Sequence, residues 1–324
     1  MTGRRGRVVV TGRIPEPGVE LLRAAGHDVD AWIEDDPMPR DELLRRVVGA
    51  DALVTLLTER VDAELLDAAG PQLRAVCNVA VGHDNIDLAA CRERAVTATN
   101  TPGVLTDATA DLAMALILMV TRRLGEGERL VRSGEPWRWG MSMMLGTGLQ
   151  GRRLGVVGMG QIGTALARRA QAFGMSVAYT NRRRVDPAVA AELGAAHVSL
   201  DELLATSDVV SLHCPLTPET RHLIGEAELA TMRPGAFLVN TARGAVVDEA
   251  ALVTALEAGR IAGAGLDVFE HEPQVHEGLL GRDDVVLIPH LGSATEETRA
   301  AMAVLAARNA LALVTGETAL TPIG

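Results

Sequence analysis

The chain has 324 residues, of which 42 are acidic and 31 basic, and its formal net charge is −11. This balance argues against a protein that coats nucleic acid or an anionic membrane surface, although a local basic site is compatible with it. Because 48% of the residues are hydrophobic, the chain can bury a sizeable core, and its length predicts roughly two domains.

The first residues, MTGRRGRVVV, carry charge and lead directly into a strand-like run, so we expect no secretory signal. The longest apolar run, LAMALILMV at residues 112–120, has nine residues, whereas a bilayer span needs about 20. It predicts a buried helix or a helix at an interface. Cys77, Cys91 and Cys214 form no CxxC pair and fit no disulfide framework. We therefore expect a cytoplasmic protein with no membrane or nucleic-acid partner.

The first hundred residues alternate short apolar runs with helical patterns. Strands are expected in RVVVTG, ADALVTLLT, LRAVCNVA and AVTATN, and PEPGVELLRAAG is typical of a helix with Pro at its start and Gly at its end. Strands separated by helices predict βαβ units and a parallel sheet.

A second alternating series follows a long helical pattern, TDATADLAMALILMVTRRL, and a loop rich in Gly, Met and Trp, SGEPWRWGMSMMLGTGLQG. It begins at RRLGVVGMG and continues through SVAYT, DVVSLH, AFLVNT, AGAGLDVF and VVLIPH. The segment EETRAAMAVLAARNALALVTG predicts a final helix. The second half of the chain therefore predicts another α/β domain.

The segment GVVGMGQIG places Gly158, Gly160 and Gly163 in the spacing GxGxxG. The pattern alone is weak, but here it follows an apolar strand and opens an amphipathic helix, which is the context that a dinucleotide site requires. The first Gly makes the turn, the second lets the backbone approach a pyrophosphate, and the third lets the helix pack on the strand. A tight turn without a ligand is the weaker alternative.

The next strand, SVAYT, ends just before Asn181, where an NAD site usually carries Asp or Glu for the ribose 2′-hydroxyl. Arg182, Arg183 and Arg184 follow. A carboxylate would repel a 2′-phosphate, Asn does not, and guanidinium groups bind phosphate well. The stretch favours NADP(H), with Arg182 as first choice for the contact, Arg183 as second, and NAD(H) as the other option. The alternative is a solvated run before a helix that Asp186 caps.

Three further segments place polar residues directly after apolar strands, where an open α/β sheet binds its ligands. NTARGAVVD contains Arg243, GLDVFEHEP contains Asp267 and Glu272, and VVLIPHLGSAT contains His290. Singly, each has an ordinary structural explanation. Together, downstream of a dinucleotide pattern, they indicate a proton donor, its carboxylate partner and an anchor for an anion.

The segment HEPQVH, with His271 and His276, resembles a zinc-binding helix motif only superficially. Its spacing is off by one, and Pro273 opposes the helix that such ligands need. We predict no catalytic metal.

The chain resembles the D-isomer-specific 2-hydroxyacid dehydrogenases. The family's motifs stand in order between about residues 50 and 310 as VGHDNIDL, NTP, TADLAMALIL, GVVGMGQIG, PLTPET, NTARGAVVDEAAL, AGAGLDVFEHEP and PHLGSAT. Within the family, NVAVGHDNID, LLTERVD and YTNRRR are most similar to the glyoxylate and hydroxypyruvate reductases.

The resemblance implies an α/β fold of two domains. A Rossmann-type cofactor domain, residues 102–290, would be inserted in a flavodoxin-like substrate domain, residues 1–101 and 291–324. It also implies a homodimer through the cofactor domains, to which LAMALILMV could contribute.

The implied activity is the NADPH-dependent reduction of a small 2-oxo acid, such as glyoxylate or hydroxypyruvate, to the D-2-hydroxy acid. His290 would act as acid/base, Glu272 would favour its protonated form, and Arg243 would hold the substrate carboxylate. The other substrate-binding positions are Leu57 and the backbone of Val81 and Gly82. Arg243 and His290 also count among the cofactor positions, with Thr106, Gly158, Met159, Gly160, Gln161, Ile162, Gly163, Asn181, Arg182, Arg183, Cys214, Pro215, Thr241, Ala242, Asp267 and Gly292.

One departure leaves the substrate open: Met143 stands where related reductases often carry a Trp that reaches the partner's pocket, and Trp137 and Trp139 lie a few residues earlier. A relative acting on another 2-hydroxy acid, of phosphoglycerate or D-lactate type, is the main alternative. A non-catalytic protein that senses NAD(P)H is a further one, which the presence of Arg243, Glu272 and His290 disfavours.

Overall fold

The structure is a computed structural model and describes residues 5–323. The chain divides into two compact units, which are treated separately: unit 1 comprises Met1–Leu105 and Ala294–Gly324, and unit 2 comprises Thr106–Ser293. The sequence placed these boundaries at 101/102 and 290/291. The second one lies later because Leu291 and Gly292 donate backbone hydrogen bonds to Asp267, which keeps them in unit 2.

Unit 1 is built on a parallel sheet of five strands in the order β2-β1-β3-β4-β5, the flavodoxin-like order. The strands are β1 (Arg7–Val10), β2 (Asp28–Ala31), β3 (Ala52–Thr55), β4 (Ala75–Asn78) and β5 (Thr97–Thr99). The helices are α1 (Glu16–Ala24), α2 (Arg40–Arg46), α3 (Ala63–Ala69), α4 (Leu88–Glu93) and α12 (Glu296–Thr315). β2 was missing from the sequence expectation because this edge strand, DVDA, is polar and partly exposed.

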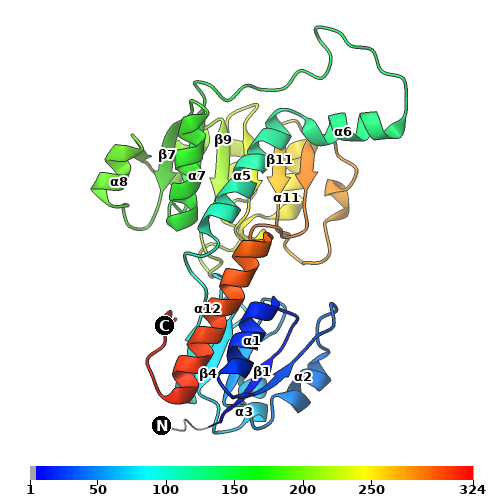
Figure 1. Ribbon diagram of the computed structural model, residues 1–324. Coiled ribbons are helices and arrows are strands. Elements are labelled where there is room, and N and C mark those ends of the chain that lie inside the picture. The colour runs from blue at the N-terminus through cyan, green and yellow to red at the C-terminus, as the bar shows by residue number, and fades with distance from the viewer. Residues whose placement is uncertain (1–4, 324) are drawn as a thin grey trace. The chain divides into compact units, whose positions relative to one another are not determined.

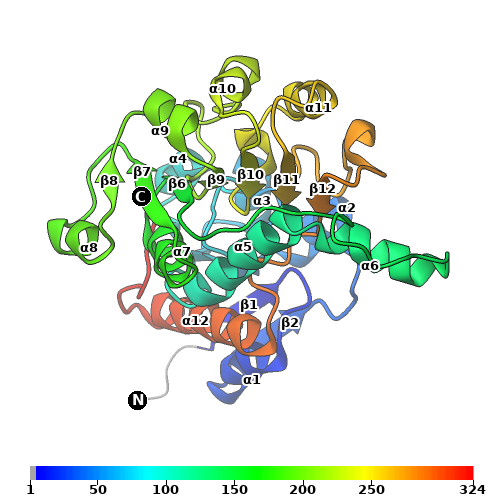
Figure 2. The ribbon, with the colours of Figure 1, turned by 90° about the horizontal axis from the view of Figure 1, so that it is seen from above.

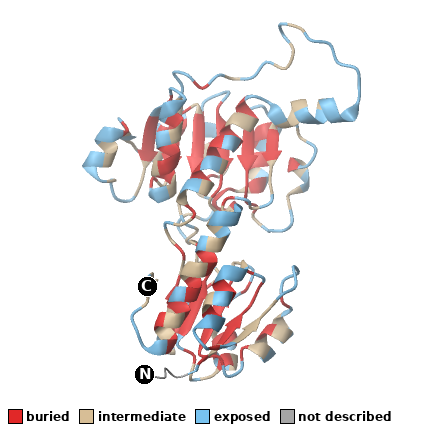
Figure 3. Ribbon diagram, in the orientation of Figure 1, coloured by how far each residue is buried: buried red, intermediate tan, exposed pale blue. Residues whose placement is uncertain are grey.

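The two faces of this sheet carry separate cores. Val8 and Val10 of β1 pack on one face with Ala303 of α12, whereas Val9 packs on the other face with Leu65 of α3. Neighbouring strand residues point to opposite faces, so a continuous apolar run fills both cores. Figure 1 shows α1 and α12 together on one side of the unit 1 strands. In Figure 3 the central strands are largely buried, as β3 and β4 are throughout, whereas the edge strand β2 is partly exposed.

Unit 2 is built on a parallel sheet of seven strands in the order β12-β11-β10-β9-β6-β7-β8, a doubly wound order of Rossmann type. The strands are β6 (Arg153–Val157), β7 (Ser176–Thr180), β8 (Ala196–His197), β9 (Val209–Leu212), β10 (Phe237–Asn240), β11 (Gly263–Leu266) and β12 (Val285–Leu287). The helices are α5 (Thr106–Thr121), α6 (Leu124–Ser133), α7 (Gln161–Ala172), α8 (Pro187–Glu192), α9 (Leu200–Thr206), α10 (Glu226–Thr231) and α11 (Glu249–Glu257), with short 3₁₀ turns η1 (Gly244–Val246) and η2 (Glu277–Leu279). Figure 2 shows α5 and α7 on one face of the sheet and α9, α10 and α11 on the other. The expected two-domain α/β fold is confirmed.

The long helical pattern predicted at residues 106–124 forms α5, and a further helix that was not predicted from the sequence, α6, begins where that pattern ends. α5 ends at Thr121, and Arg123 takes a left-handed conformation (φ +53°) before α6 begins. The apolar run at residues 112–120 buries Leu116 and Ile117 completely in the core of its own unit, beside β10, β11 and α7. The apolar side chains of α5 are therefore largely buried within unit 2 itself. None of the described helices has the length and apolarity that a bilayer crossing needs.

Candidate active site

The glycine-rich turn between β6 and α7 has the geometry that a dinucleotide requires. Gly158 has φ +92°, and a Cβ there would lie 2.6 Å from the backbone nitrogen of Cys214. A Cβ at Gly163 would lie 2.8 Å from the carbonyl oxygen of Gly158, because the helix packs closely on the strand. A Cβ at Gly160 would meet nothing within 4 Å. The second glycine thus faces open space, as close approach of a pyrophosphate demands.

The start of α7 completes this cradle. Its N-cap, Gly160, has no side chain to cap the helix, so the N–H groups of the first turn stay available for an anion. Thr106 donates a hydrogen bond to the side-chain oxygen of Gln161 at 3.4 Å, which joins two predicted cofactor positions. The buried Thr241 hydroxyl has no hydrogen-bond partner among the described residues. These features fit a bound nicotinamide dinucleotide.

Asn181 follows β7 and is fastened to the glycine-rich turn. Its Oδ1 accepts from the backbone N–H of Met159 at 2.6 Å, and its Nδ2 donates to the carbonyl of Met159 at 3.2 Å. His197 lies 3.3 Å from the Asn181 carbonyl through Nε2. The side-chain amide predicted to admit a 2′-phosphate therefore also holds the loop that would bind the pyrophosphate.

The three arginines after Asn181 are exposed, and no ion pair involves them in the described part of the chain. They differ in surroundings. The pKa of the Glu219 carboxyl is lowered chiefly by a hydrogen bond from Thr217, and the positive charge of Arg182 contributes to the shift. The charge of Arg182 thus acts on the loop after β9, which carries Cys214 and Pro215.

Glu272 and His290 form the most direct pairing in the predicted catalytic set. Nδ1 of His290 lies 2.8 Å from Oε2 of Glu272, while Oε1 of Glu272 accepts from the backbone N–H of Phe269 at 3.0 Å. Both side chains are about one-third exposed. Nε2 of His290 has no hydrogen bond to any described residue, so the carboxylate engages one ring nitrogen while the other remains available.

The charges around Glu272 keep it ionised. Burial works to raise its pKa, but the hydrogen bond from His290 and the positive charges of His290 and Arg243 outweigh burial, so the net pKa is lowered. Arg243 follows β10 in an extended conformation, and its carbonyl accepts from the side chain of Asn240 at 2.9 Å. A cation, a carboxylate and an imidazole therefore meet at the carboxyl ends of β10, β11 and β12.

Asp267 organises the loop that carries His290. Its carboxylate accepts from the backbone N–H of Leu291 at 2.5 Å and of Gly292 at 2.9 Å, and its carbonyl accepts from the N–H of His290 at 2.8 Å. Thr109 donates to the carbonyl of Gly292 at 3.0 Å. These bonds support the left-handed conformation of His290 (φ +50°), which is strained for a residue with a side chain. Burial raises the pKa of Asp267, although the two N–H groups and His290 oppose it.

The Arg243 and Glu272 loops are packed backbone to backbone. A Cβ at Gly244 would lie 1.8 Å from the carbonyl carbon of Phe269, so only glycine fits there. Glu249, which is buried, accepts from the N–H of Glu270 at 2.8 Å and anchors the same loop from α11.

The predicted positions after β9 lie next to the glycine-rich turn. Cys214 is partly buried, and burial raises the pKa of its thiol to about 11, so it is a neutral apolar neighbour there. Burial also lowers the pKa of the adjacent His213 to about 4, and its Nε2 lies 2.9 Å from the Ser211 hydroxyl.

The predicted substrate positions Leu57, Val81 and Gly82 belong to unit 1 and follow β3 and β4, which are neighbours in its sheet. The carbonyls of Val81 and Gly82 accept hydrogen bonds from Asn100 and Asn78, while their N–H groups have no acceptor among the described residues. They share the carboxyl-terminal edge of their own sheet.

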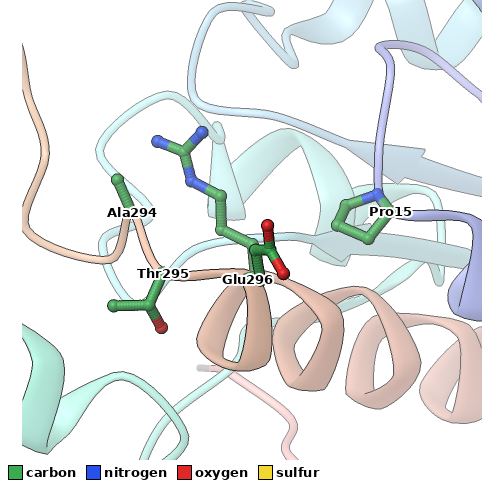
Figure 4. A pocket seen from close by; sticks show the side chains of 5 residues that line it. Pro15, Ala294, Thr295 and Glu296 are labelled. Carbon is green, nitrogen blue, oxygen red and sulfur yellow. The ribbon is translucent and has the colours of Figure 1, made fainter.

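His276, Met143 and a surface hollow are not part of the Arg243, Glu272 and His290 cluster. His276 caps η2 by accepting from the N–H of Gly278 at 3.1 Å, and Met143 lies partly buried in the loop after α6. A shallow hollow at the start of α12 contains none of the predicted site residues (Figure 4). It is lined by Pro15, Ala294, Thr295, Glu296 and Arg299.

Sequence reasoning named Asn181 and Asp267 as cofactor positions but missed that their side chains hold these loops. The hydrogen bonds of Asn181 and Asp267 reach backbone groups 22 to 25 positions away, and no local pattern marks such pairs. The amides of Asn78 and Asn85 and the buried carboxylate of Glu59 were likewise not singled out, although their motifs, NVAVGHDNID and LLTERVD, were.

Residues 114–292 match the family model described as D-isomer specific 2-hydroxyacid dehydrogenase, NAD binding domain. The chain is 51% identical over 316 residues to a glyoxylate reductase from Thermococcus litoralis, covering 96% of this chain and 94% of that protein. A glyoxylate reductase structure from Paecilomyes thermophila is similar with a TM-score of 0.89 at 37% identity, covering 98% of both chains. An NADPH-dependent glyoxylate/hydroxypyruvate reductase from Sinorhizobium meliloti, in complex with NADP and malonate, has a TM-score of 0.86 at 35% identity, covering 99% of this chain and 97% of that one.

The fold, the glycine-rich turn and these similarities agree with the resemblance seen in the sequence motifs. The chain belongs to the D-isomer specific 2-hydroxyacid dehydrogenases, a family of oxidoreductases with a NAD-binding domain.

Proposed function

We propose that the protein reduces a small 2-oxo acid, such as glyoxylate or hydroxypyruvate, to the D-2-hydroxy acid, with NADPH as the reductant. The observation that carries this proposal is the 2.8 Å pairing of His290 with Glu272 beside the charge of Arg243, on the sheet edge that also bears the glycine-rich turn. The relatives named glyoxylate reductase support this substrate class.

The chain's own residues have distinct roles in this reaction. Bound NADPH supplies a hydride to the carbonyl carbon. His290 gives a proton from Nε2 to the developing alkoxide, because Nδ1 is engaged by Glu272. The Glu272 carboxylate stabilises the imidazolium before that transfer. Arg243 binds the substrate carboxylate and polarises the carbonyl.

The remaining predicted contacts complete the substrate and cofactor sites. The N–H groups of Val81 and Gly82 add hydrogen bonds to the substrate carboxylate, and Leu57 lines the space for a small substrate side chain. On the cofactor, Arg182 contacts the 2′-phosphate, and the neutral side chain of Asn181 admits that phosphate where a carboxylate would repel it.

The catalytic assignment is tested with His290→Ala and Arg243→Ala, and with His276→Ala as a control outside the site. Each of the first two should cut the kcat/KM for glyoxylate by at least about 100-fold, while NADPH binding, followed by fluorescence, stays near the wild-type value. Near-normal turnover by His290→Ala would show that another group supplies the proton.

The substrate assignment is tested by initial rates with glyoxylate, hydroxypyruvate, pyruvate and a phosphorylated 2-oxo acid, each with NADPH and NADH. Glyoxylate or hydroxypyruvate should have the highest kcat/KM. A preference for pyruvate or for the phosphorylated acid would indicate a dehydrogenase of the D-lactate or phosphoglycerate type, respectively. No turnover with any of the four acids would favour a non-catalytic NAD(P)H-binding protein.

The cofactor assignment is tested by comparing Arg182→Ala with Arg184→Ala. Loss of the phosphate contact should raise the KM for NADPH about tenfold or more in Arg182→Ala and leave the KM for NADH unchanged. Arg184→Ala should change neither value. Equal wild-type rates with NADH and NADPH would contradict the proposed preference.

We also infer that the protein forms a homodimer through unit 2. Large apolar side chains are exposed on α6 and the loop after it, including Val131 (64%), Trp137 (51%), Trp139 (77%) and Met141 (83%). Figures 1 and 3 show this segment extending from unit 2 with an exposed surface. Large apolar side chains exposed close together in the sequence are typical of an interaction surface. Light scattering should give twice the mass of the chain, and Trp139→Glu should shift the protein toward monomer.

A further inference from the structure

The side-chain amide of Asn85 joins two loops of unit 1. Its Nδ2 donates to the carbonyls of Leu56 and Glu59, both at 3.0 Å, and its Oδ1 accepts from Nδ2 of Asn78 at 3.1 Å. Leu56 and Glu59 bound the loop after β3 that contains Leu57. Asn78 ends β4 and precedes the loop that contains Val81 and Gly82.

The loop after β4, residues 79–83, has its carbonyls held from within unit 1. The Ala80 carbonyl accepts from the N–H of Thr101 at 2.8 Å, and the Val81 carbonyl accepts from Nδ2 of Asn100 at 2.8 Å. The Gly82 carbonyl accepts from Nδ2 of Asn78 at 3.0 Å. Each of these three peptide groups is therefore oriented by a donor on one side.

In a trans peptide the N–H points opposite to the carbonyl of the same plane. The bonds to the carbonyls of residues 80, 81 and 82 therefore turn the N–H groups of Val81, Gly82 and His83 away from those donors. Within the described residues, none of these three N–H groups has an acceptor. Three consecutive free N–H groups form a concavity suited to an anionic oxygen.

The buried side chain of Glu59 also stabilises the loop after β3. Its carboxylate accepts from the N–H of Leu56 at 2.5 Å and from the hydroxyls of Thr11 at 2.8 Å and Thr58 at 2.5 Å. The carbonyls of Leu56 and Glu59 accept from the Asn85 amide, which links this loop to Asn78 beside the bond from the Thr55 hydroxyl to Asn78 at 3.0 Å.

We propose that Asn85 is a positioning residue for substrate binding: its amide fixes the Leu57 loop and, through Asn78, aims the N–H groups of residues 81–83 at the substrate carboxylate. This proposal rests on the proposed function and adds the His83 N–H to the two backbone donors predicted from the sequence. In this role Asn85 acts through the two loops that its amide bonds. Its loss should weaken substrate binding while the proton-transfer machinery of unit 2 remains intact.

Gln72 offers a matched control in the same unit. Its Nε2 also donates to two backbone carbonyls, of Ala50 at 3.1 Å and of Ala69 at 2.5 Å, and it is likewise partly buried. Ala50 precedes β3, so Gln72 acts at the amino end of the strand, whereas Asn85 acts at its carboxyl end. Comparing substitutions of the two residues thus distinguishes a general loss of stability from a specific effect on the substrate-binding loops.

The test compares Asn85→Leu with Gln72→Met, which keep side-chain size without adding charge. Both should lower Tm by similar amounts. Asn85→Leu should raise the KM for glyoxylate about tenfold, with kcat within about twofold and the Kd for NADPH unchanged. Gln72→Met should leave the KM at the wild-type value. If Asn85→Leu does not fold, Asn85→Ala and Gln72→Ala form the milder pair with the same expectation.

An unchanged KM in Asn85→Leu, or an equal rise in both variants, would overturn the positioning role while the enzyme remains a glyoxylate reductase. A wild-type protein that reduced none of the 2-oxo acids would overturn the proposed function, and the positioning role with it.

Discussion

The side-chain amide of Asn181 is hydrogen-bonded through both its oxygen and its nitrogen to the backbone of Met159. Asn181 follows β7, the strand after which this fold binds the ribose, and Met159 lies inside the glycine-rich turn. The position proposed to distinguish NADPH from NADH therefore also holds the glycine-rich turn in place. Substitutions there act on two properties, which have to be separated by experiment.

Asn181→Asp should reverse part of the cofactor preference. The carboxylate repels a 2′-phosphate and accepts from a 2′-hydroxyl, so the ratio of kcat/KM for NADPH to that for NADH should fall at least about tenfold. Asn181→Leu removes the fastening without adding charge and should weaken both cofactors alike. A ratio that is the same in both variants would mean that charge at residue 181 does not select the cofactor.

Glu272→Gln should slow the reaction without weakening the cofactor. The folded protein lowers the pKa of Glu272, so it is a carboxylate at neutral pH, and the neutral amide cannot stabilise an imidazolium equally well. We expect kcat for glyoxylate to fall about 10- to 100-fold, and the loss of rate with rising pH to begin at a lower pH.

Glu277→Gln, at an exposed position on η2, is the control for this change. Its pH–rate profile should overlay that of the wild type. An unaltered pH–rate profile in Glu272→Gln would show that the 2.8 Å contact between Glu272 and His290 has no role in catalysis.

His213 should make the fold sensitive to mild acid. Its pKa is about 4 in the folded protein, because of burial, against about 6.5 in an unfolded chain. Between these values the unfolded state binds more protons, so stability falls as pH drops from about 6.5 toward 4. In His213→Gln, Tm should fall less than in the wild type between pH 7.5 and 4.5, as measured by circular dichroism. Parallel curves would exclude this residue as a source of the effect.

Gly244→Ala should damage both stability and catalysis. The added methyl would overlap the backbone of Phe269, which cannot yield as a flexible side chain does. The N–H of Phe269 donates to Glu272, the carboxylate proposed to act in catalysis. We expect a loss of at least about 2 kcal/mol in the free energy of unfolding and a lower kcat.

Gly140→Ala serves as the comparison, because a Cβ at Gly140 meets nothing within 4 Å. The free energy of unfolding of Gly140→Ala, measured with denaturant, should stay close to the wild-type value. If both alanine variants were equally stable, the loops carrying Arg243 and Glu272 would be less tightly packed than the structure shows.

Local chemistry explains which features could be predicted from the sequence. The glycine pattern at residues 158–163 was recognised because each glycine meets a requirement within one turn: a positive φ, open space, or close packing. The helix α6 was not predicted, because its sequence, LGEGERLVRS, contains two glycines and none of its residues is buried, so no apolar stripe marks it. The edge strand β2 was missed because half of its residues are polar.

The sequence by itself determined the two α/β halves, the family and the candidates Arg243, Glu272 and His290, since each follows an apolar strand and lies in a family motif. Only the tertiary structure decided how these loops are held. Asp267 bonds the loop of His290, Asn181 bonds the glycine-rich turn, and Asn85 bonds the loop of Leu57. These are bonds from side chains to the backbone of other segments. They form only when parallel strands adopt their order in the sheet and bring their carboxyl ends to one edge, which no local periodicity specifies.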